Sequence, residues 1–147
     1  MKKSIVSSVL ALSLVVVLSV VSAPAQFTQR LTVTIPFAFE IGDSSFPSGE
    51  YAMTDTQNAG LWLIRNPQVG KGEFFSTVAV RSSGKYGNAS ISFRRYADKY
   101  FLAEVFDGID SDSRKLPVSR HEKDFLGAAS QTAQGSRQPD LIVLEAH

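Results

Sequence analysis

The sequence predicts an all-β fold: a single antiparallel β-sandwich or small β-barrel of about seven or eight strands, with one short helix in its C-terminal half. Three observations predict it. Apolar and polar residues alternate between Leu31 and Ile41, the period-two pattern of a strand with one buried face. Turn-forming residues then recur at short intervals. A helix start signal is found at one place, Ser119.

The start of the chain is typical of a signal peptide. Lys2 and Lys3 precede an apolar stretch, and Ala23-Pro24-Ala25 places small residues where a signal peptidase cuts. Residues 1–25 are therefore predicted to be removed, and the mature domain is predicted to span residues 26–147. The protein is expected to be exported to the periplasm or outside the cell, and to meet a membrane only through its signal peptide before cleavage.

Without the signal peptide, 122 of the 147 residues remain, which is enough for one domain with a single core. The signal peptide takes two of the 15 basic residues and none of the 14 acidic ones, so the formal net charge becomes −1. This charge gives no reason to expect a nucleic-acid partner. The absence of cysteine excludes disulfides and thiolate metal sites, and it fits a bacterial envelope protein.

The stretch from Leu31 to Ile41 is the clearest strand. Its apolar set includes Phe37 and Phe39, which are predicted to be core residues. Pro36 lies on the outward set and removes a ladder donor, so the strand is expected at a sheet edge, or bulged or bent near its middle. Residues 42–45 and 46–49 are predicted to be turns.

The middle of the chain is predicted to form three strands. One starts near Glu50 and one covers Leu61 to Arg65, where Trp62 is expected to be a core residue. The third runs from Gly72 to Val80, a segment rich in Phe, Thr and Val. Residues 82–88 are expected to form the loop that follows.

Residues 90–106 are predicted to form a hairpin with a three-residue turn at 97–99, so that Tyr96 faces Tyr100. This register places an apolar set on the core face, namely Ile91, Phe93, Phe101, Ala103 and Val105. The opposite face carries Arg94, Tyr96, Tyr100 and Glu104. Tyrosine and arginine are favoured at interfaces, so these four residues are the candidate binding site; the alternative is a solvated hairpin tip.

Ser119 and Glu122 have the spacing of a capping box, in which each side chain accepts from or reaches back to the backbone of the other residue. The helix is expected to end at Gly127 or near Ser130. Residues 127–139 are expected to form an exposed linker, and Leu141 to Leu144 a final strand.

No catalytic residue and no cofactor are expected. His121 lies beside basic residues in the first turn of the helix and His147 ends the chain, and no nucleophile-elbow motif accompanies either. Asp107, Asp110 and Asp112 are a weak calcium candidate, because their spacing lacks the EF-hand order of ligands. A solvated acidic turn is the alternative, so no metal is assigned.

Three segments resemble an uncharacterised family of small secreted proteins found mainly in soil bacteria of the acidobacterial kind. They are Val33-Thr-Ile-Pro-Phe-x-Phe39 continued by Pro47-x-Gly-Glu-Tyr51, Arg95-Tyr-x-Asp-Lys-Tyr-Phe-Leu-x-Glu-Val105, and Leu116-Pro-x-Ser-Arg-x-Glu-Lys123. The resemblance covers about residues 31–126 and departs from the usual pattern at Ala97, where glycine is typical. It implies a signal peptide and an all-β domain, and it implies no activity.

The sequence therefore favours an exported non-enzymatic β domain that binds a small ligand or a partner protein, or that has a structural role in the envelope. Two alternatives remain open. One is a small outer-membrane β-barrel, for which the strands are short. The other is an exported hydrolase, which lacks an identifiable nucleophile and base.

Overall fold

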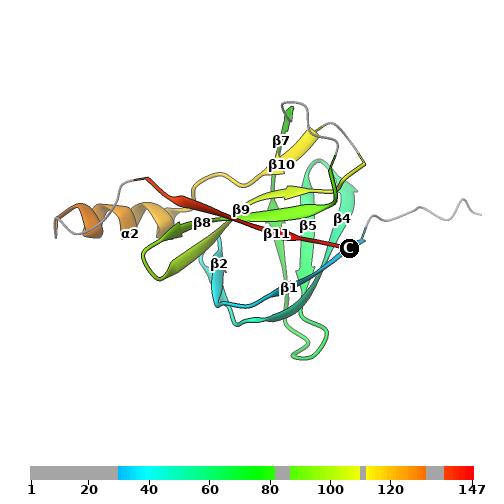
Figure 1. The fold of residues 1–147 in the computed structure, drawn as a ribbon, viewed down its shortest axis with the longest axis horizontal. Coiled ribbons are helices and arrows are strands. Elements are labelled where there is room, and N and C mark those ends of the chain that lie inside the picture. The colour runs from blue at the N-terminus through cyan, green and yellow to red at the C-terminus, as the bar shows by residue number, and fades with distance from the viewer. Residues whose placement is uncertain (1–29, 82–86, 110–111, 132–137) are drawn as a thin grey trace, which may run out of the picture.

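The computed structural model describes residues 30–81, 87–109, 112–131 and 138–147. These residues form two sheets and one helix, as shown in Figure 1. The all-β, sandwich-like prediction is confirmed. The described residues contain eleven strands rather than seven or eight, because two predicted strands are each divided and two short strands were not predicted. The predicted signal peptide lies outside the described residues.

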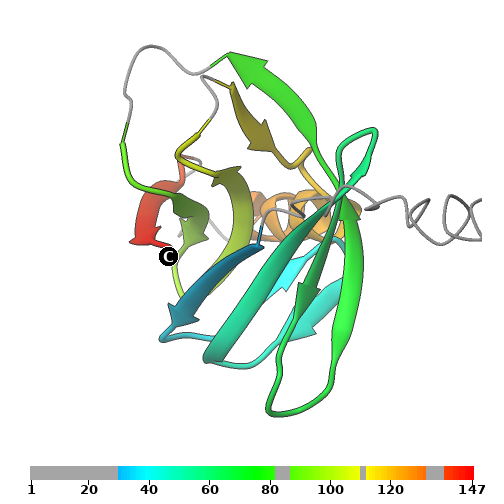
Figure 2. The same ribbon diagram turned by 90° about the vertical axis from the view of Figure 1, so that its right-hand side faces the viewer.

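The smaller sheet has four antiparallel strands in the order β1-β4-β5-β6. β4, β5 and β6 follow one another along the chain, so short turns connect them. In Figure 2 these strands, coloured blue to green, lie on one side of the molecule. The strands are β1 (Arg30–Ile35), β4 (Gly49–Asn58), β5 (Leu61–Arg65) and β6 (Gly72–Ser76).

The larger sheet has the order β11-β8-β9-β10-β7; β2 lies beside the first half of β9, and β3 pairs with β2. All its pairs are antiparallel except that of β2 with β9, where Glu40 is opposite Phe101. Its strands are β2 (Phe39–Ile41), β3 (Ser44–Phe46), β7 (Val78–Arg81), β8 (Ser90–Tyr96), β9 (Lys99–Phe106), β10 (Asp112–Lys115) and β11 (Asp140–Glu145).

The chain changes sheet at Pro36. β1 is an edge strand of the smaller sheet and ends at Ile35, and the chain then continues as β2 in the larger sheet. Proline cannot donate to a ladder, which explains why the strand stops there. The predicted edge position and bend are both confirmed. Phe39 is buried as expected, whereas Phe37 is half-buried beside the core.

A second change of sheet occurs at Thr77. The prediction of one strand from Gly72 to Val80 is wrong, because β6 and β7 belong to different sheets. The backbone N–H and the hydroxyl of Thr77 both donate to the Gly60 carbonyl, each at 2.8 Å, and so hold this crossing to the smaller sheet. A Cβ on Gly60 would lie 2.5 Å from the Thr77 carbonyl oxygen, so this approach requires glycine.

The sheets meet again at the end of the chain. Thr32 in β1 and His147 exchange two backbone hydrogen bonds of 2.7 and 2.9 Å, directly after β11. Among the described residues the strands form two open sheets that touch at these corners, not one closed barrel.

The core fills the space between the sheets. Its largest fully buried apolar side chains come from both layers, and Trp62 is among them as predicted: Trp62, Tyr51, Phe39, Phe46, Phe93, Ile35, Met53 and Ile64. Phe39 packs edge-on against Tyr51 and Phe93, with ring centroids 5.1 and 5.4 Å away. Such aromatic contacts join β2 to both sheets.

The β8–β9 hairpin has a different register from the predicted one. Tyr96 pairs with Lys99, so the turn contains two residues, Ala97 and Asp98. An irregularity between Ser92 and Phe93 then adds one residue to β9. The shorter turn and this bulge change which residues share a face. Leu102, rather than Phe101, lies opposite Phe93 on the core side.

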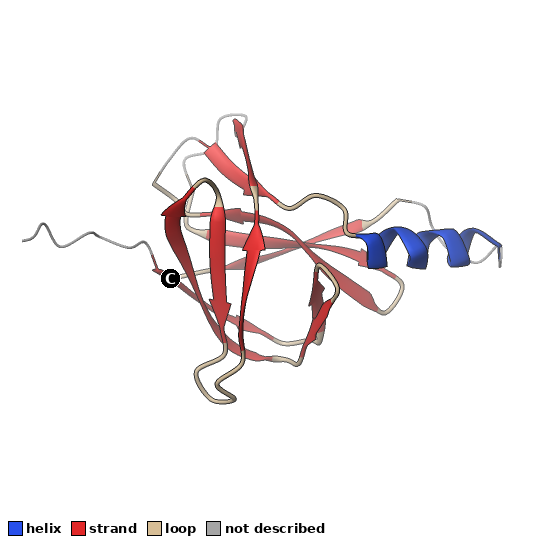
Figure 3. Ribbon diagram, turned by 180° about the vertical axis from the view of Figure 1, so that it is seen from behind, coloured by secondary structure: helices blue, strands red, loops and turns tan. Residues whose placement is uncertain are grey.

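The single described helix, α2 (Arg120–Gln131), projects at one end of the strands in Figure 3. The predicted capping contact is present, since the Glu122 N–H donates to the Ser119 hydroxyl at 3.0 Å. The first part of the predicted linker, residues 127–131, is helical instead. No helix in the described residues has the length and apolarity needed to span a membrane.

Candidate functional site

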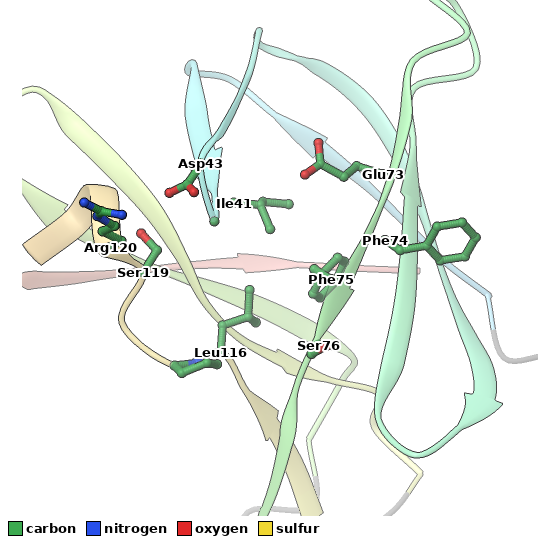
Figure 4. A pocket seen from close by; sticks show the side chains of 11 residues that line it. Ile41, Asp43, Glu73, Phe74, Phe75, Ser76, Leu116, Ser119 and Arg120 are labelled. Atoms are coloured by element: carbon green, nitrogen blue, oxygen red, sulfur yellow. The ribbon is translucent and has the colours of Figure 1, made fainter.

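A groove opens where two strands of the larger sheet separate. β7 pairs with β10 as far as Val78 and Lys115. The residues that follow are held by different partners. The Thr77 N–H donates to the Gly60 carbonyl in the turn between β4 and β5, whereas the Leu116 N–H donates to the Ala103 carbonyl at 2.8 Å. A groove of about 320 Å³ therefore lies between β6 and residues 116–120, beside the turn between β2 and β3 (Figure 4).

The groove has an apolar floor and a charged rim. Ile41, Phe75 and Leu116 converge on its centre in Figure 4, and all three are buried by their neighbours. Asp43 and Glu73 bring acidic groups to the rim, and Arg120 brings a basic one. An apolar surface bordered by a few polar groups is the usual construction of a binding site. We call this site the β6 groove.

Partners within the domain already engage part of the rim. Glu73 Oε1 accepts a hydrogen bond of 2.8 Å from the Ser44 hydroxyl, which fixes this carboxylate at the groove. Arg120 Nε lies 4.0 Å from the Asp124 carboxylate on the exposed side of α2. The rim therefore carries two acidic side chains and one basic side chain. The basic one, Arg120, lies beside an acidic residue of its own helix.

The backbone edge of β6 also borders the groove. Among the described residues β6 ends the order of the smaller sheet, so β5 is its one neighbouring strand there. Since Thr77 donates toward β5, alternation along an antiparallel strand directs the N–H and C=O groups of Phe74 and Ser76 to the opposite side. The groove therefore combines apolar, charged and backbone polar groups.

The predicted binding site is divided between two faces of the hairpin. Arg94, Tyr96 and Glu104 share the outer face of the larger sheet, as predicted. Tyr100 lies on the other face, because the two-residue turn shifts β9 by one position. Its ring stacks on Phe37 with the centroids 3.9 Å apart. The four residues therefore do not form one surface.

Arg94 and Tyr96 are covered by α2. Arg94 Nε and Nη2 donate to the two carboxylate oxygens of Glu122 at 2.6 and 2.9 Å, and the Tyr96 hydroxyl donates to Oε1 at 3.1 Å. Burial, and then the adjacent Glu122 carboxylate, raise the pKa of Tyr96 above its usual value. The Glu122 carboxylate makes these contacts in place of the predicted one to the Ser119 N–H. The second contact of the predicted capping box is therefore replaced.

Glu104 lies on the open part of the outer face. Its carboxylate is 3.9 Å from Lys115 Nζ, and it lines a shallow hollow of about 160 Å³ with Ser92, Leu141 and Val143. The Ser92 hydroxyl is buried without a hydrogen-bond partner among the described residues. Of the three predicted site residues on the outer face, Glu104 is the one for which no contact with α2 is found among the described residues.

The weak calcium candidate is only partly described. The Asp107 carboxylate accepts from the Ile109 N–H at 3.0 Å, as in an acidic turn, and Asp112 begins β10. Asp110 lies outside the described residues. No group of three or more residues able to hold a metal ion is found in the part of the chain that the structure describes.

The alternation from Leu31 to Ile41 puts Glu40 on the same outward set as Pro36, yet the Glu40 side chain is only 8 % exposed. His121 Nδ1 lies 2.8 Å from Oε2 of Glu40, and Lys99 Nζ lies 3.2 Å from Oε1. Three elements, β2, β9 and α2, thus meet at one carboxylate. The sequence held no signal for this cluster, because its residues are far apart along the chain.

Comparisons with protein-family models, with curated proteins and with solved structures give no match. The resemblance to a secreted acidobacterial family therefore stays a prediction.

Proposed function

We propose that this protein is an exported, non-enzymatic binding domain that works in the periplasm or outside the cell, and that the β6 groove is its binding site. The observation that carries the proposal is the apolar floor of Ile41, Phe75 and Leu116 at the base of an open groove. Ligand sites have volumes upward of about 300 Å³, and the groove has about 320 Å³.

A purely structural role would give no reason to keep such a groove open. Filling it with larger side chains would bury more apolar surface and would stabilise the domain. The sequence instead places Asp43 and Glu73 at its rim, where charged groups keep the entrance hydrated. This arrangement supports binding over structural filling.

The neutral fluorophore N-phenyl-1-naphthylamine tests whether the groove binds an apolar group. We expect its fluorescence to rise with the wild-type protein, and we expect Asp43→Trp, which places a bulky ring at the entrance, to weaken binding about tenfold or more. Asp98→Trp is the matched control, because Asp98 is also an acidic residue in a two-residue hairpin turn. An equal loss in both variants, or no binding by the wild type, would reject the groove as the site.

Export and processing are tested separately. We expect the protein in an osmotic-shock fraction to begin at Gln26, as the pattern Ala23-Pro24-Ala25 predicts. An intact Met1, or recovery only in detergent extracts of the outer membrane, would contradict the proposed location.

An exported hydrolase is the second candidate, and the contact of Glu40 with His121 favours it. A carboxylate hydrogen-bonded to Nδ1 orients an imidazole as a base in many hydrolases; here the two atoms are 2.8 Å apart, but their geometry is not that of a hydrogen bond. The β6 groove is not lined by His121, so binding remains the first proposal. Hydrolysis of p-nitrophenyl acetate that both Glu40→Gln and His121→Ala abolish would reverse this order.

A further inference from the structure

We infer that the occupant of the β6 groove is an extended peptide segment of a partner protein, which pairs with β6 as an added strand and carries a Lys or Arg next to an apolar residue. This inference rests on the proposed function and names its ligand. Three features of the groove argue for it: a free strand edge, an apolar floor beside that edge, and an acidic rim.

The free edge of β6 has the hydrogen-bonding pattern that a peptide backbone would match. The N–H and C=O groups of Phe74 and Ser76 point away from β5, toward the groove. A peptide strand offers alternating donors and acceptors at the same spacing, so it can satisfy all of these groups at once. A small apolar molecule would leave them unpaired.

β6 carries only part of the protection that edge strands usually have. Natural edges carry inward charges, lysines, prolines or bulges that prevent pairing. β6 has no lysine or proline, its one inward charge, Glu73, already accepts a hydrogen bond within the domain, and its Phe74 side chain is 60 % exposed. The nearest lysine, Lys71, is turned to β3, where its Nζ donates to the Ser45 carbonyl at 2.7 Å and lies 4.6 Å from the Phe46 ring centroid. The edge is therefore available to a partner.

The floor and the rim define the side chains of that partner. In a strand, alternate side chains point to opposite faces, so one set of the peptide would reach the floor and the other would remain outside. A groove of about 320 Å³ is at the lower limit for whole small molecules, which suits one or two peptide side chains better. Asp43 and Glu73 would then attract a basic residue beside the inserted apolar one.

The experiment selects ligands from a phage-displayed library of random heptapeptides on the mature protein, with Asp43→Trp as the counter-selection. We expect enriched peptides in which an apolar residue neighbours Lys or Arg. A synthetic copy labelled with fluorescein is then titrated by anisotropy. Replacing its basic residue by Glu, or Asp43 by Asn in the protein, is expected to weaken binding about tenfold.

Ser76→Pro separates strand pairing from simple occupation of the groove. It removes an N–H that points away from β5, so the ladder with β5 is kept and the variant should fold. We expect this variant to lose peptide binding while the midpoint of its urea denaturation stays close to that of the wild type, which shows that it folds. As a second measurement, the peptide is N-methylated either at its odd-numbered or at its even-numbered residues. Only one of these two sets would donate to β6, so methylation of that set alone should abolish binding.

The outcomes distinguish the two proposals. If the fluorophore binds and Asp43→Trp blocks it, but no peptide is enriched or the peptide binds Ser76→Pro normally, the groove is a binding site and the strand-pairing inference is wrong. If neither fluorophore nor peptide binds, both proposals fail.

Discussion

The contact between Arg94 and Glu122 is the most informative one to break, because it fastens α2 to the larger sheet. Glu122 is 1 % exposed, and it receives two hydrogen bonds from Arg94 and one from Tyr96. The substitution Arg94→Leu removes both guanidinium bonds and leaves the carboxylate buried with the tyrosine hydroxyl alone.

The expected cost follows from the burial of the pair. Removing one partner of a buried ion pair destabilises a protein by about 3 to 5 kcal/mol, because the other charge stays desolvated. The double substitution Arg94→Leu with Glu122→Leu removes that charge as well, and buried pairs replaced by apolar residues are often neutral or stabilising. We therefore expect the double variant to be more stable than Arg94→Leu alone.

Urea denaturation followed by tryptophan fluorescence measures these differences, since Trp62 is buried in the core. The neighbouring Arg95→Leu is the matched control. Arg95 pairs with Asp140 at 2.7 Å, but both side chains are exposed, so this pair should contribute about 1 kcal/mol or less. Two results would show that the buried pair does not hold the helix as described. One is an equal loss of stability for Arg94→Leu and Arg95→Leu, and the other is a double variant whose loss is the sum of the losses of its two single variants.

Three further predictions concern the strands. Phe39→Ala should lower the free energy of unfolding by about 3 to 5 kcal/mol, and the exposed Thr34→Ala by about 0.5 or less; similar losses in denaturant melts would refute the face assignment. Ala97 has a positive φ of 54°, so Ala97→Gly should raise stability by about 1 kcal/mol in the same melts, and a loss would contradict this. The pKa of Tyr96 is raised on folding, so its stabilising effect is full below about pH 10 and is lost as the pH rises through the folded value; Tyr96→Phe should lose less stability at alkaline pH than the wild type, and equal losses would refute this.

The fold class was predictable because its signals are local. The alternation from Leu31 to Ile41 identified a strand, Pro36 identified its bend, and Ser119 identified the helix start. Each of these depends on a few neighbouring residues and on backbone chemistry that tolerates little variation. The structure confirms all three.

The site was not predictable because it depends on pairings between distant residues. The three-residue turn at 97–99 was preferred because it kept Glu104 off the core face. The two-residue turn also keeps Glu104 off the core face, because β9 has an extra residue beside Phe93. A bulge has no reliable sequence signal, and a one-residue shift moves Tyr100 to the opposite face. Glu40 was likewise placed outward correctly, but the helix that covers its face could not be foreseen.

The β6 groove follows from the two places where the chain changes sheet. At Pro36 the chain leaves the smaller sheet, which brings Ile41 and Asp43 to one end of the groove. At Thr77 the chain leaves it again, which separates β6 from the ladder that β7 forms with β10. A closed barrel would pair β6 along its whole length and leave neither a floor nor a free edge. The open edge is therefore a direct consequence of a sandwich whose strands cross between sheets, and the residues that cause the crossings lie outside the groove that they create.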